Sequence, residues 1–389
     1  MALPVIALVA LQLNRALPAP VVRLAVATTS AAASGDPPKL PWPMTGEAAV
    51  AVPDRGLLIQ SGPEDPVPVA SLTKIMTAYL ILRDHPLSPT TQGPTVALND
   101  DDQNEAQDDE VSGATEVPVQ PGEVLTERQL LDGLLVRSAN NFADVLAQWD
   151  AGSVPAFVAR MNATATTLGM RKTHYVDANG LHPQSVSTAG DELRVAVDAM
   201  AMPAFAAIVS QSTIVLPIAG SMPNYVSSIG TDGIVGVKSG FTQAAMGCLV
   251  MAAHRSVAGR TVLVMAAVTG QPGITPLDTA NTADVSLVDA VAGDLSVRSI
   301  LSRTAMAATV ATSWHDGVTA DPARTVTLLT WPGDVVHLSF TPAHVPVGAR
   351  AGTLAGTLVI SDGAERVSVG VRTTASVTGP PLSWKLKRG

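Results

Sequence analysis

The sequence has a single cysteine and few aromatic residues, and it lacks an excess of basic residues. The lone Cys248 excludes an intramolecular disulfide, and its place in the apolar stretch 246–253 favours a buried strand thiol over a nucleophile. Aromatic residues make up only 3%, so the core must consist mainly of Ala, Val and Leu, which the apolar share of 47% can supply. A net charge of −9 leaves no basic excess to neutralise phosphates, which argues against a nucleic-acid partner.

The length of 389 residues exceeds what one hydrophobic core usually organises and predicts two domains. Closely spaced prolines in residues 35–41 exclude both helix and central strand and predict a linker, so the folded body begins near Trp42. Beyond residue 297, alternating apolar and polar residues separated by Pro/Gly turns predict a small β-rich domain over 297–380, a sandwich or barrel. Residues 381–389 form a basic tail.

Residues 1–34 are interpreted as an export segment, either a signal peptide or an anchor. Residues 1–13 are uncharged and mostly apolar, and residues 28–34 are small side chains suited to signal cleavage. No basic residue precedes the apolar run, Pro4 interrupts it, and it is short for a membrane span. A disordered leader on a cytoplasmic protein therefore stays open as the alternative.

Periodicity between the linker and residue 297 predicts a mixture of helices and antiparallel strands. A capping box formed by Thr126 and Gln129 marks the start of one strongly apolar helix. Strands are expected over 48–52, 56–60, 233–237, 246–254 and 261–269, and helices over 71–83, 130–135, 141–149, 153–168 and 277–292. The expected fold class is α/β, with an antiparallel sheet flanked by helices and an all-helical subdomain.

Three short motifs follow one another in this predicted domain. They are Ser71-Leu72-Thr73-Lys74, then Ser138-Ala139-Asn140, then Lys238-Ser239-Gly240. Each is short enough to recur by chance. Among six lysines, however, only Lys74 has a serine three residues earlier, and neither of the other two patterns occurs a second time. The ordered trio is typical of serine enzymes that transfer acyl groups.

The first motif pairs a nucleophile with a base. Residues three apart on a helix share a face, so Lys74 can place its amine beside the Ser71 hydroxyl. A lysine becomes a useful base only when burial or a neighbouring cation lowers its pKa, and Lys238 is the candidate cation. The two lysines are then expected to titrate as a coupled set.

The other motif residues suit the remaining steps of acyl transfer. A helix start at Ser71 and the backbone N–H of Phe241 on an edge strand would form an oxyanion hole. Ser138 could relay a proton to the leaving amine, while the Asn140 amide could hold Lys74 and a substrate carbonyl. We expect Lys238, Ser239 and Thr242 to bind a substrate carboxylate, and Gly240, which lacks a β-carbon, to let the substrate approach the strand.

Other catalytic plans are poorly supported. Neither a G-x-S-x-G elbow nor an H-E-x-x-H motif occurs, and the seven histidines lack metal-like spacing. His182 is interpreted as a loop histidine, with contact to a substrate left open. The acidic residues crowded into 98–111 lack the pattern of a calcium loop and predict a solvated loop.

The longer strings around the three motifs resemble those of serine-type D-alanyl-D-alanine carboxypeptidases. This family, peptidase family S11, comprises low-molecular-mass penicillin-binding proteins, and the similarity is greatest to its actinobacterial branch. The strings are Val69-Ala70-Ser71-Leu72-Thr73-Lys74-Ile75-Met76-Thr77, Leu135-Val136-Arg137-Ser138-Ala139-Asn140-Asn141 and Gly236-Val237-Lys238-Ser239-Gly240-Phe241-Thr242. The resemblance runs from about Trp42 to at least Val268.

The resemblance implies a β-lactamase/transpeptidase-like catalytic domain over residues 42–296. It further implies removal of the terminal D-alanine from peptidoglycan stem peptides outside the cytoplasmic membrane, covalent inhibition by β-lactams, and no metal or cofactor. Carried over by position, Ser71 is the acyl-ester nucleophile, Lys74 the base, Ser138 and Asn140 the second element, and Lys238 the carboxylate-binding residue.

The sequence departs from the family pattern at three places. Ser239 replaces the usual threonine but keeps a hydroxyl. The arginine that many relatives place after the third strand is not evident in residues 269–275. The amphipathic C-terminal membrane anchor common among relatives is also not clear, which leaves peripheral membrane or cell-wall association open.

Two other functions remain as alternatives. A β-lactamase would need a dedicated glutamate and water to hydrolyse the acyl-enzyme, and no Glu-x-x-x-Asn segment lies between the second and third motifs. A slow or non-catalytic penicillin-binding sensor of the cell wall would keep the trio while the β-rich domain supplies its contacts.

Overall fold

A computed structural model describes residues 9–31, 38–62, 65–104 and 115–387. The chain forms two compact units, one of residues Lys39–Gly293 and the other of Met1–Pro38 together with Asp294–Gly389. Parts of three predicted segments lie outside the described residues: positions 1–8 of the export segment, 35–37 of the linker and 105–111 of the acidic loop.

The unit of residues 39–293 is built on a five-stranded antiparallel sheet in the order β11-β12-β13-β3-β4. Its strands are β3 (Glu47–Val52), β4 (Leu57–Gln60), β11 (Ile234–Thr242), β12 (Met246–Val257) and β13 (Arg260–Gln271). β12 and β13 meet at a tight turn where Gly259 has φ +82°, a conformation that glycine adopts without steric cost. β11 is an edge strand, so one side of its backbone is open to a partner.

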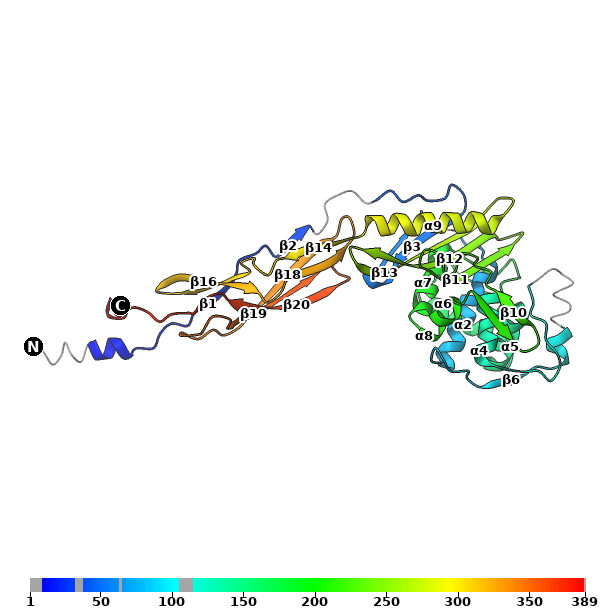
Figure 1. Cartoon of the computed structure of the whole chain (residues 1–389), viewed down its shortest axis with the longest axis horizontal. Coiled ribbons are helices and arrows are strands. Elements are labelled where there is room, and N and C mark those ends of the chain that lie inside the picture. Colours follow the sequence, from blue (N-terminus) through cyan, green and yellow to red (C-terminus); the bar gives the residue numbers. More distant parts are fainter. Residues whose placement is uncertain (1–8, 32–37, 63–64, 105–114, 388–389) are drawn as a thin grey trace, which may run out of the picture. The chain divides into compact units, whose positions relative to one another are not determined.

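Helices cover both faces of this sheet, as Figure 1 shows. α9 (Pro276–Asp294) lies along one face, while α7 (Ala189–Met200) packs on the other and contacts α2 (Thr73–Asp84). Burial on both faces explains why β12 and β13 read as nearly continuous apolar runs.

An all-helical subdomain packs beside the sheet. It consists of α4 (Glu127–Asp132), the π-helical turn η3 (Gly133–Arg137), α5 (Asn140–Ala151), α6 (Val154–Thr167) and α8 (Pro203–Val209). The capping box predicted at Thr126 and Gln129 is confirmed, with both reciprocal hydrogen bonds present. α6 ends as expected before Gly169, whose φ is +75°.

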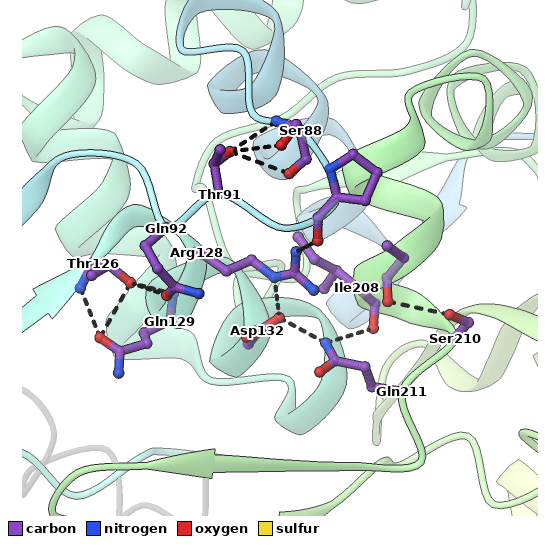
Figure 2. Close-up of polar contacts among 12 residues, drawn as sticks. Ser88, Thr91, Gln92, Thr126, Arg128, Gln129, Asp132, Ile208, Ser210 and Gln211 are labelled. Carbon is purple, nitrogen blue, oxygen red and sulfur yellow. Dashed lines mark hydrogen bonds and ion pairs between the residues drawn. The ribbon is translucent and has the colours of Figure 1, made fainter.

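A polar network joins α4 to the C-terminal end of α8 (Figure 2). Arg128 donates to Asp132 Oδ1 and to the Pro89 carbonyl, both at 2.8 Å. Gln211 Nε2 donates to the same Asp132 oxygen at 2.8 Å and to the Ile208 carbonyl at 3.2 Å. The network fixes the end of α4, and the chain runs from there through η3 into the second motif.

Short elements complete this unit. They are the 3-10 helices η1 (Pro53–Arg55) and η2 (Ala70–Leu72), and three two-stranded pairs: β5 (Val67–Pro68) with β8 (Val186–Ser187), β6 (Thr95–Ala97) with β7 (Val124–Thr126), and β9 (Thr213–Leu216) with β10 (Gly220–Pro223). The pairing of β5 with β8 lies just ahead of the first motif.

The other unit is β-rich. Its seven-stranded antiparallel sheet has the order β1-β15-β16-β20-β19-β18-β2, and a separate pair joins β14 to β17. The bounds are β1 (Val21–Leu24), β2 (Thr29–Ala31), β14 (Ser296–Leu301), β15 (Ala308–Thr312), β16 (His315–Pro322), β17 (Val326–Thr330), β18 (Val335–Pro342), β19 (Leu354–Ser361) and β20 (Arg366–Thr373).

Both edges of the seven-stranded sheet are strands from the N-terminal part of the chain. β1 pairs with β15, β2 pairs with β18, and only residues 25–28 separate β1 from β2. Val22, Leu24 and Val26 pack against the core of this unit. The structure therefore places two strands inside the segment that the sequence analysis interprets as an export signal, and removal of residues 1–34 would strip both edges of the sheet.

The two ends of the described chain are helical. Residues 9–14 form a short helix, and α10 (Leu382–Lys387) occupies most of the predicted basic tail. No helix within the described ranges is long and apolar enough to cross a bilayer.

Candidate active site

Ser71 and Lys74 lie where the short helix η2 passes into α2. The sequence predicts a helix that begins at Ser71. The structure places Ser71 in η2, and α2 begins two residues later at Thr73. Ala70, just before the serine, has φ +47°, a conformation uncommon for a residue with a β-carbon. The turn leaves Ser71 partly exposed while Lys74 is fully buried.

The Lys74 amine is surrounded by three oxygen atoms. Nζ lies 3.1 Å from Ser71 Oγ, 2.5 Å from Asn140 Oδ1 and 2.6 Å from the Asn179 carbonyl oxygen. Two of the three predicted motifs thus meet at one nitrogen atom. The predicted proximity of Ser71, Lys74 and Asn140 is present in the structure.

The second motif sits at the junction of η3 and α5. η3 ends at Arg137, and Ser138 adopts a left-handed conformation with φ +67°. The Ala139 N–H donates to the Gly133 carbonyl at 3.1 Å, and Asn140 then starts α5. This sharp turn buries both Ser138 and Asn140 and directs the Asn140 amide to Lys74.

The third motif lies within the edge strand β11, which contacts η2. A β-carbon added at Gly240 would lie 2.9 Å from the Ser71 backbone nitrogen and 3.1 Å from the Val69 carbonyl oxygen, so the strand and η2 meet here at backbone distance. Ser239 is buried, Thr242 Oγ accepts a hydrogen bond from the Ala245 N–H, and Phe241 is 49% exposed. Contact of these last three residues with a substrate stays a prediction.

Lys238 is the second buried lysine of the site. Its Nζ donates to the Ser239 carbonyl at 2.8 Å, and its side chain is fully buried. Burial, followed by the nearby charge of Lys74, holds the pKa of Lys238 well below its usual range. The charge of Lys74 thus acts on Lys238, while coupled titration of the two lysines stays a prediction.

Two residues that support Lys74 were not predicted from the sequence. The Asn179 carbonyl accepts from Lys74, and the Asn179 side chain donates to Asp144 Oδ2 at 2.8 Å. Gly180 follows with φ +83°, and a β-carbon there would collide with the Ala70 carbonyl oxygen. The Asn179-Gly180 pair, a turn signal, was the available hint. Asp144 lies four residues after Asn140, which places both on one face of α5.

Two other predicted residues lie outside this cluster of contacts. Cys248 is buried in β12, and burial raises its pKa to about 12, which suits a structural thiol. His182 is exposed in the loop after Asn179, where its Nδ1 accepts from the Gln184 N–H.

A hydroxyl within reach of a buried amine, next to a backbone-lined strand edge, can carry out nucleophilic acyl transfer. The amine can take the hydroxyl proton, and the oxygen can then attack a carbonyl placed along β11. Among the described residues no group of His, Cys, Asp and Glu side chains is arranged to hold a metal ion.

The sequence and the fold are similar to those of known proteins. A family model described as D-alanyl-D-alanine carboxypeptidase, peptidase S11, matches residues 46–269. A D-alanyl-D-alanine endopeptidase of Pseudomonas aeruginosa is 32% identical over 255 residues, which cover 61% of this chain and 78% of the relative. The D-alanyl-D-alanine carboxypeptidase DacB2 of Mycobacterium tuberculosis is 36% identical over 173 residues, which cover 43% of this chain and 59% of the relative.

A solved structure is similar over most of the chain. It is a peptidoglycan synthesis regulatory factor, PBP3, from Streptococcus pneumoniae, with a TM-score of 0.62 and 21% identity over 90% of this chain and all of the other. This likeness confirms the predicted transpeptidase-like fold with its β-rich second part. The family model spans more than half of the chain and contains all three motifs. The chain belongs to the D-alanyl-D-alanine carboxypeptidase family, peptidase family S11.

Proposed function

We propose that the protein is a serine-type D-alanyl-D-alanine carboxypeptidase that removes the terminal D-alanine from peptidoglycan stem peptides through an acyl-enzyme on Ser71. The observation that carries the proposal is the 3.1 Å contact between Lys74 Nζ and Ser71 Oγ, at the side of an edge strand. Ser71 attacks the peptide carbonyl, Lys74 accepts its proton, and D-alanine leaves with a proton on its amine. Water then hydrolyses the ester.

The residues around this pair have complementary roles in the proposal. The backbone N–H groups of Ser71 and Phe241 stabilise the oxyanion, as donors fixed before the reaction do. Ser138 passes a proton to the leaving amine, and Asn140 holds Lys74. Lys238, Ser239 and Thr242 bind the substrate carboxylate, beside the open backbone approach at Gly240. The closeness of Gly240 to the Ser71 nitrogen supports this arrangement of strand and nucleophile.

The substrate places the protein outside the cytoplasm, where peptidoglycan is cross-linked, and makes β-lactams covalent inhibitors. A cyclic amide laid along β11 acylates Ser71 as the peptide does. Peripheral association with the membrane or the cell wall is compatible with the basic residues Lys385 and Lys387 in α10.

Endopeptidase activity is a second candidate. Relatives from Pseudomonas aeruginosa and Escherichia coli, 32% and 31% identical, are named D-alanyl-D-alanine endopeptidases. An endopeptidase cleaves a bond inside a cross-linked peptide, where the residue after the cleaved bond need not be the C-terminal residue of the chain. The two activities therefore differ in whether a free carboxylate is required.

The test compares peptide substrates with a covalent probe. The purified protein and its Ser71→Ala variant are incubated with diacetyl-Lys-D-Ala-D-Ala, with the same peptide bearing a C-terminal amide, with a cross-linked stem-peptide dimer, and with a fluorescent penicillin. Carboxypeptidase activity predicts D-alanine release from the free acid and slow covalent labelling, both absent in the variant.

The other outcomes separate the alternatives. Preferential cleavage of the dimer would assign the endopeptidase activity. Rapid turnover of penicillin would indicate a β-lactamase, and labelling without cleavage of any peptide would indicate a penicillin-binding sensor.

A further inference from the structure

We propose that Asp144 is a positioning residue for the lysine base of this site. Through the Asn179 side chain it holds the Asn179 carbonyl against Lys74, so that the lone pair of the amine faces the Ser71 hydroxyl. The inference rests on the proposed function in one respect, namely that Lys74 accepts the serine proton. It assigns a task to a carboxylate outside all three motifs.

The hydrogen-bonding capacity of the Lys74 amine depends on whether the amine is neutral or charged. A neutral amine has two N–H donors and one lone pair, whereas an ammonium has three donors and no acceptor. Asn140 Oδ1 and the Asn179 carbonyl oxygen, at 2.5 and 2.6 Å, can only accept. They occupy the two N–H groups of a neutral amine. The remaining lone pair is then left for Ser71 Oγ, at 3.1 Å, whose hydroxyl can donate.

The two carbonyl oxygens that contact Lys74 are held in place in different ways. Asn140 belongs to α5, and its backbone N–H donates to the Thr115 carbonyl at 2.9 Å. Asn179 lies in a loop, where a carbonyl is less constrained than in a helix. Its position depends on its side chain: Oδ1 accepts from the Leu181 N–H at 2.9 Å, and Nδ2 donates to Asp144 Oδ2 at 2.8 Å.

Asp144 and Asn140 are neighbours on one face of α5. They lie four residues apart on α5, and both are buried. The helix therefore sets the distance between the two carbonyl oxygens that hold Lys74: one directly through Asn140, the other through Asp144 and Asn179. A hydrogen bond from Thr77 Oγ to the Ala178 carbonyl, at 2.7 Å, ties the same loop to α2.

Asp144 could instead act through its negative charge, or only through folding. The proposal requires that a hydrogen-bond acceptor at this position be sufficient, whether or not it is charged. Asp144→Asn keeps an acceptor oxygen for Asn179 Nδ2 and removes the charge, whereas Asp144→Ala removes both. The pair of variants separates the two roles.

The experiment measures acylation of the full-length protein by a fluorescent penicillin across pH, with the rate constant of acylation and the non-covalent affinity determined separately. Asp144→Ala is expected to lower the plateau rate about 10- to 100-fold, because small misplacements of a reacting group cost that much, with affinity unchanged. Asp144→Asn is expected to acylate within about threefold of the wild-type rate, since the acceptor is retained.

Asn179→Ala removes the same hydrogen bond from the loop side and keeps the backbone carbonyl. The double variant with Asp144→Ala is expected to be no slower than the slower single variant, because both changes break one interaction. Asp284→Ala, which removes a buried carboxylate in the same unit away from the site, is the control and should acylate at the wild-type rate.

Wild-type rates in folded Asp144→Ala would overturn the inference. So would equal loss in Asp144→Ala and Asp144→Asn, or a shift of the half-maximal pH in both with the plateau retained, since these would assign the effect to charge. If Asp144→Ala does not fold, Asn179→Ala decides by the same rates. Wild-type protein that is acylated by penicillin but releases no D-alanine would reject the proposed function and leave this test intact.

Discussion

At Gly240 the third motif meets the first at backbone distance. A β-carbon at this position would lie 2.9 Å from the Ser71 nitrogen and 3.2 Å from the Leu72 nitrogen, both backbone atoms that cannot rotate away. Gly240→Ala must therefore push β11 and η2 apart. We expect acylation by penicillin to fall about 100-fold, because a displacement near 1 Å costs that much, while the fold is retained.

A matched glycine gives the control for this change. Gly293 lies at the end of α9 with nothing within 4 Å of an added β-carbon, so Gly293→Ala should leave acylation unchanged and stabilise the helix slightly. Measured acylation rates of the two variants decide the matter. Equal rates for Gly240→Ala and wild-type protein would show that the strand need not approach the nucleophile so closely.

The buried carboxyl group of Asp284 destabilises the core. It is fully buried in α9, neither carboxylate oxygen has a hydrogen-bond partner, and burial raises its pKa well above the usual value. The folded protein therefore holds a proton there that the unfolded chain releases near pH 4. Stability falls as pH rises above that value.

Asp284→Ala is expected to stabilise this unit at pH 7 by about 1–3 kcal/mol, the usual cost of an unsatisfied buried polar group. The corresponding rise in thermal midpoint is roughly 2–4 °C per kcal/mol for a unit of this size. Calorimetry at pH 4 and pH 7 checks both the sign and the trend, since the gain should be larger at pH 7. A loss of stability at pH 7, or a gain independent of pH, would contradict the assignment.

At the residue scale, the side chains whose chemistry is unusual could be predicted from the sequence. Ser71, Lys74 and Asn140 could be predicted to meet because spacing and type are specific to acyl transfer. Asn179 could not, because its contribution is a backbone carbonyl, which every residue carries. Asp144 could not either, because its partner is 35 residues away and only the fold brings them together.

At the element scale, several helices and the edge strand β4 were predicted near their observed positions, whereas α7 and α8 were not predicted. α5 and α6 lie within one or two residues of the expected spans. The apolar pattern predicted a strand over 233–237, with Gly240 and Phe241 expected at a strand edge, and the structure shows one continuous strand β11 that contains the whole third motif. The Lys-Ser-Gly sequence conceals this part of the strand because it lacks the apolar pattern by which strands are recognised.

The edge strands β1 and β2 were not predicted, because an apolar N-terminal segment was read as an export signal. Their inward residues Val22 and Leu24 alternate with the exposed Val21 and Arg23, the pattern of a strand with one buried face. These strands cover both edges of a seven-stranded sheet that would otherwise expose unpaired backbone groups.

We therefore expect the double variant Val22→Lys/Leu24→Lys to destabilise the β-rich unit by about 2–5 kcal/mol, since it places two charges against an apolar core. Val21→Lys, on the exposed side of the same strand, is the control and should leave the stability of the unit unchanged. Hydrogen exchange of β15 and β18 amides gives the readout. Unchanged protection in the double variant would show that the segment is dispensable.

At the scale of the whole molecule, the two units differ in how far the sequence explains them. The unit of residues 39–293 contains every residue of the proposed site and the whole of the family match. The β-rich unit is assembled from segments more than 250 residues apart in sequence, a pairing that local patterns do not encode.

We infer that the fold gathers the three motifs so that Lys74 activates Ser71 for acylation. Mass spectrometry of the intact protein after exposure to benzylpenicillin, followed by peptide mapping, tests it most directly. We expect one adduct per chain, located on Ser71. The adduct should be absent in Ser71→Ala and form at least about 100-fold more slowly in Lys74→Ala, which lacks the base. An adduct on another residue, or equal rates without the lysine, would contradict it.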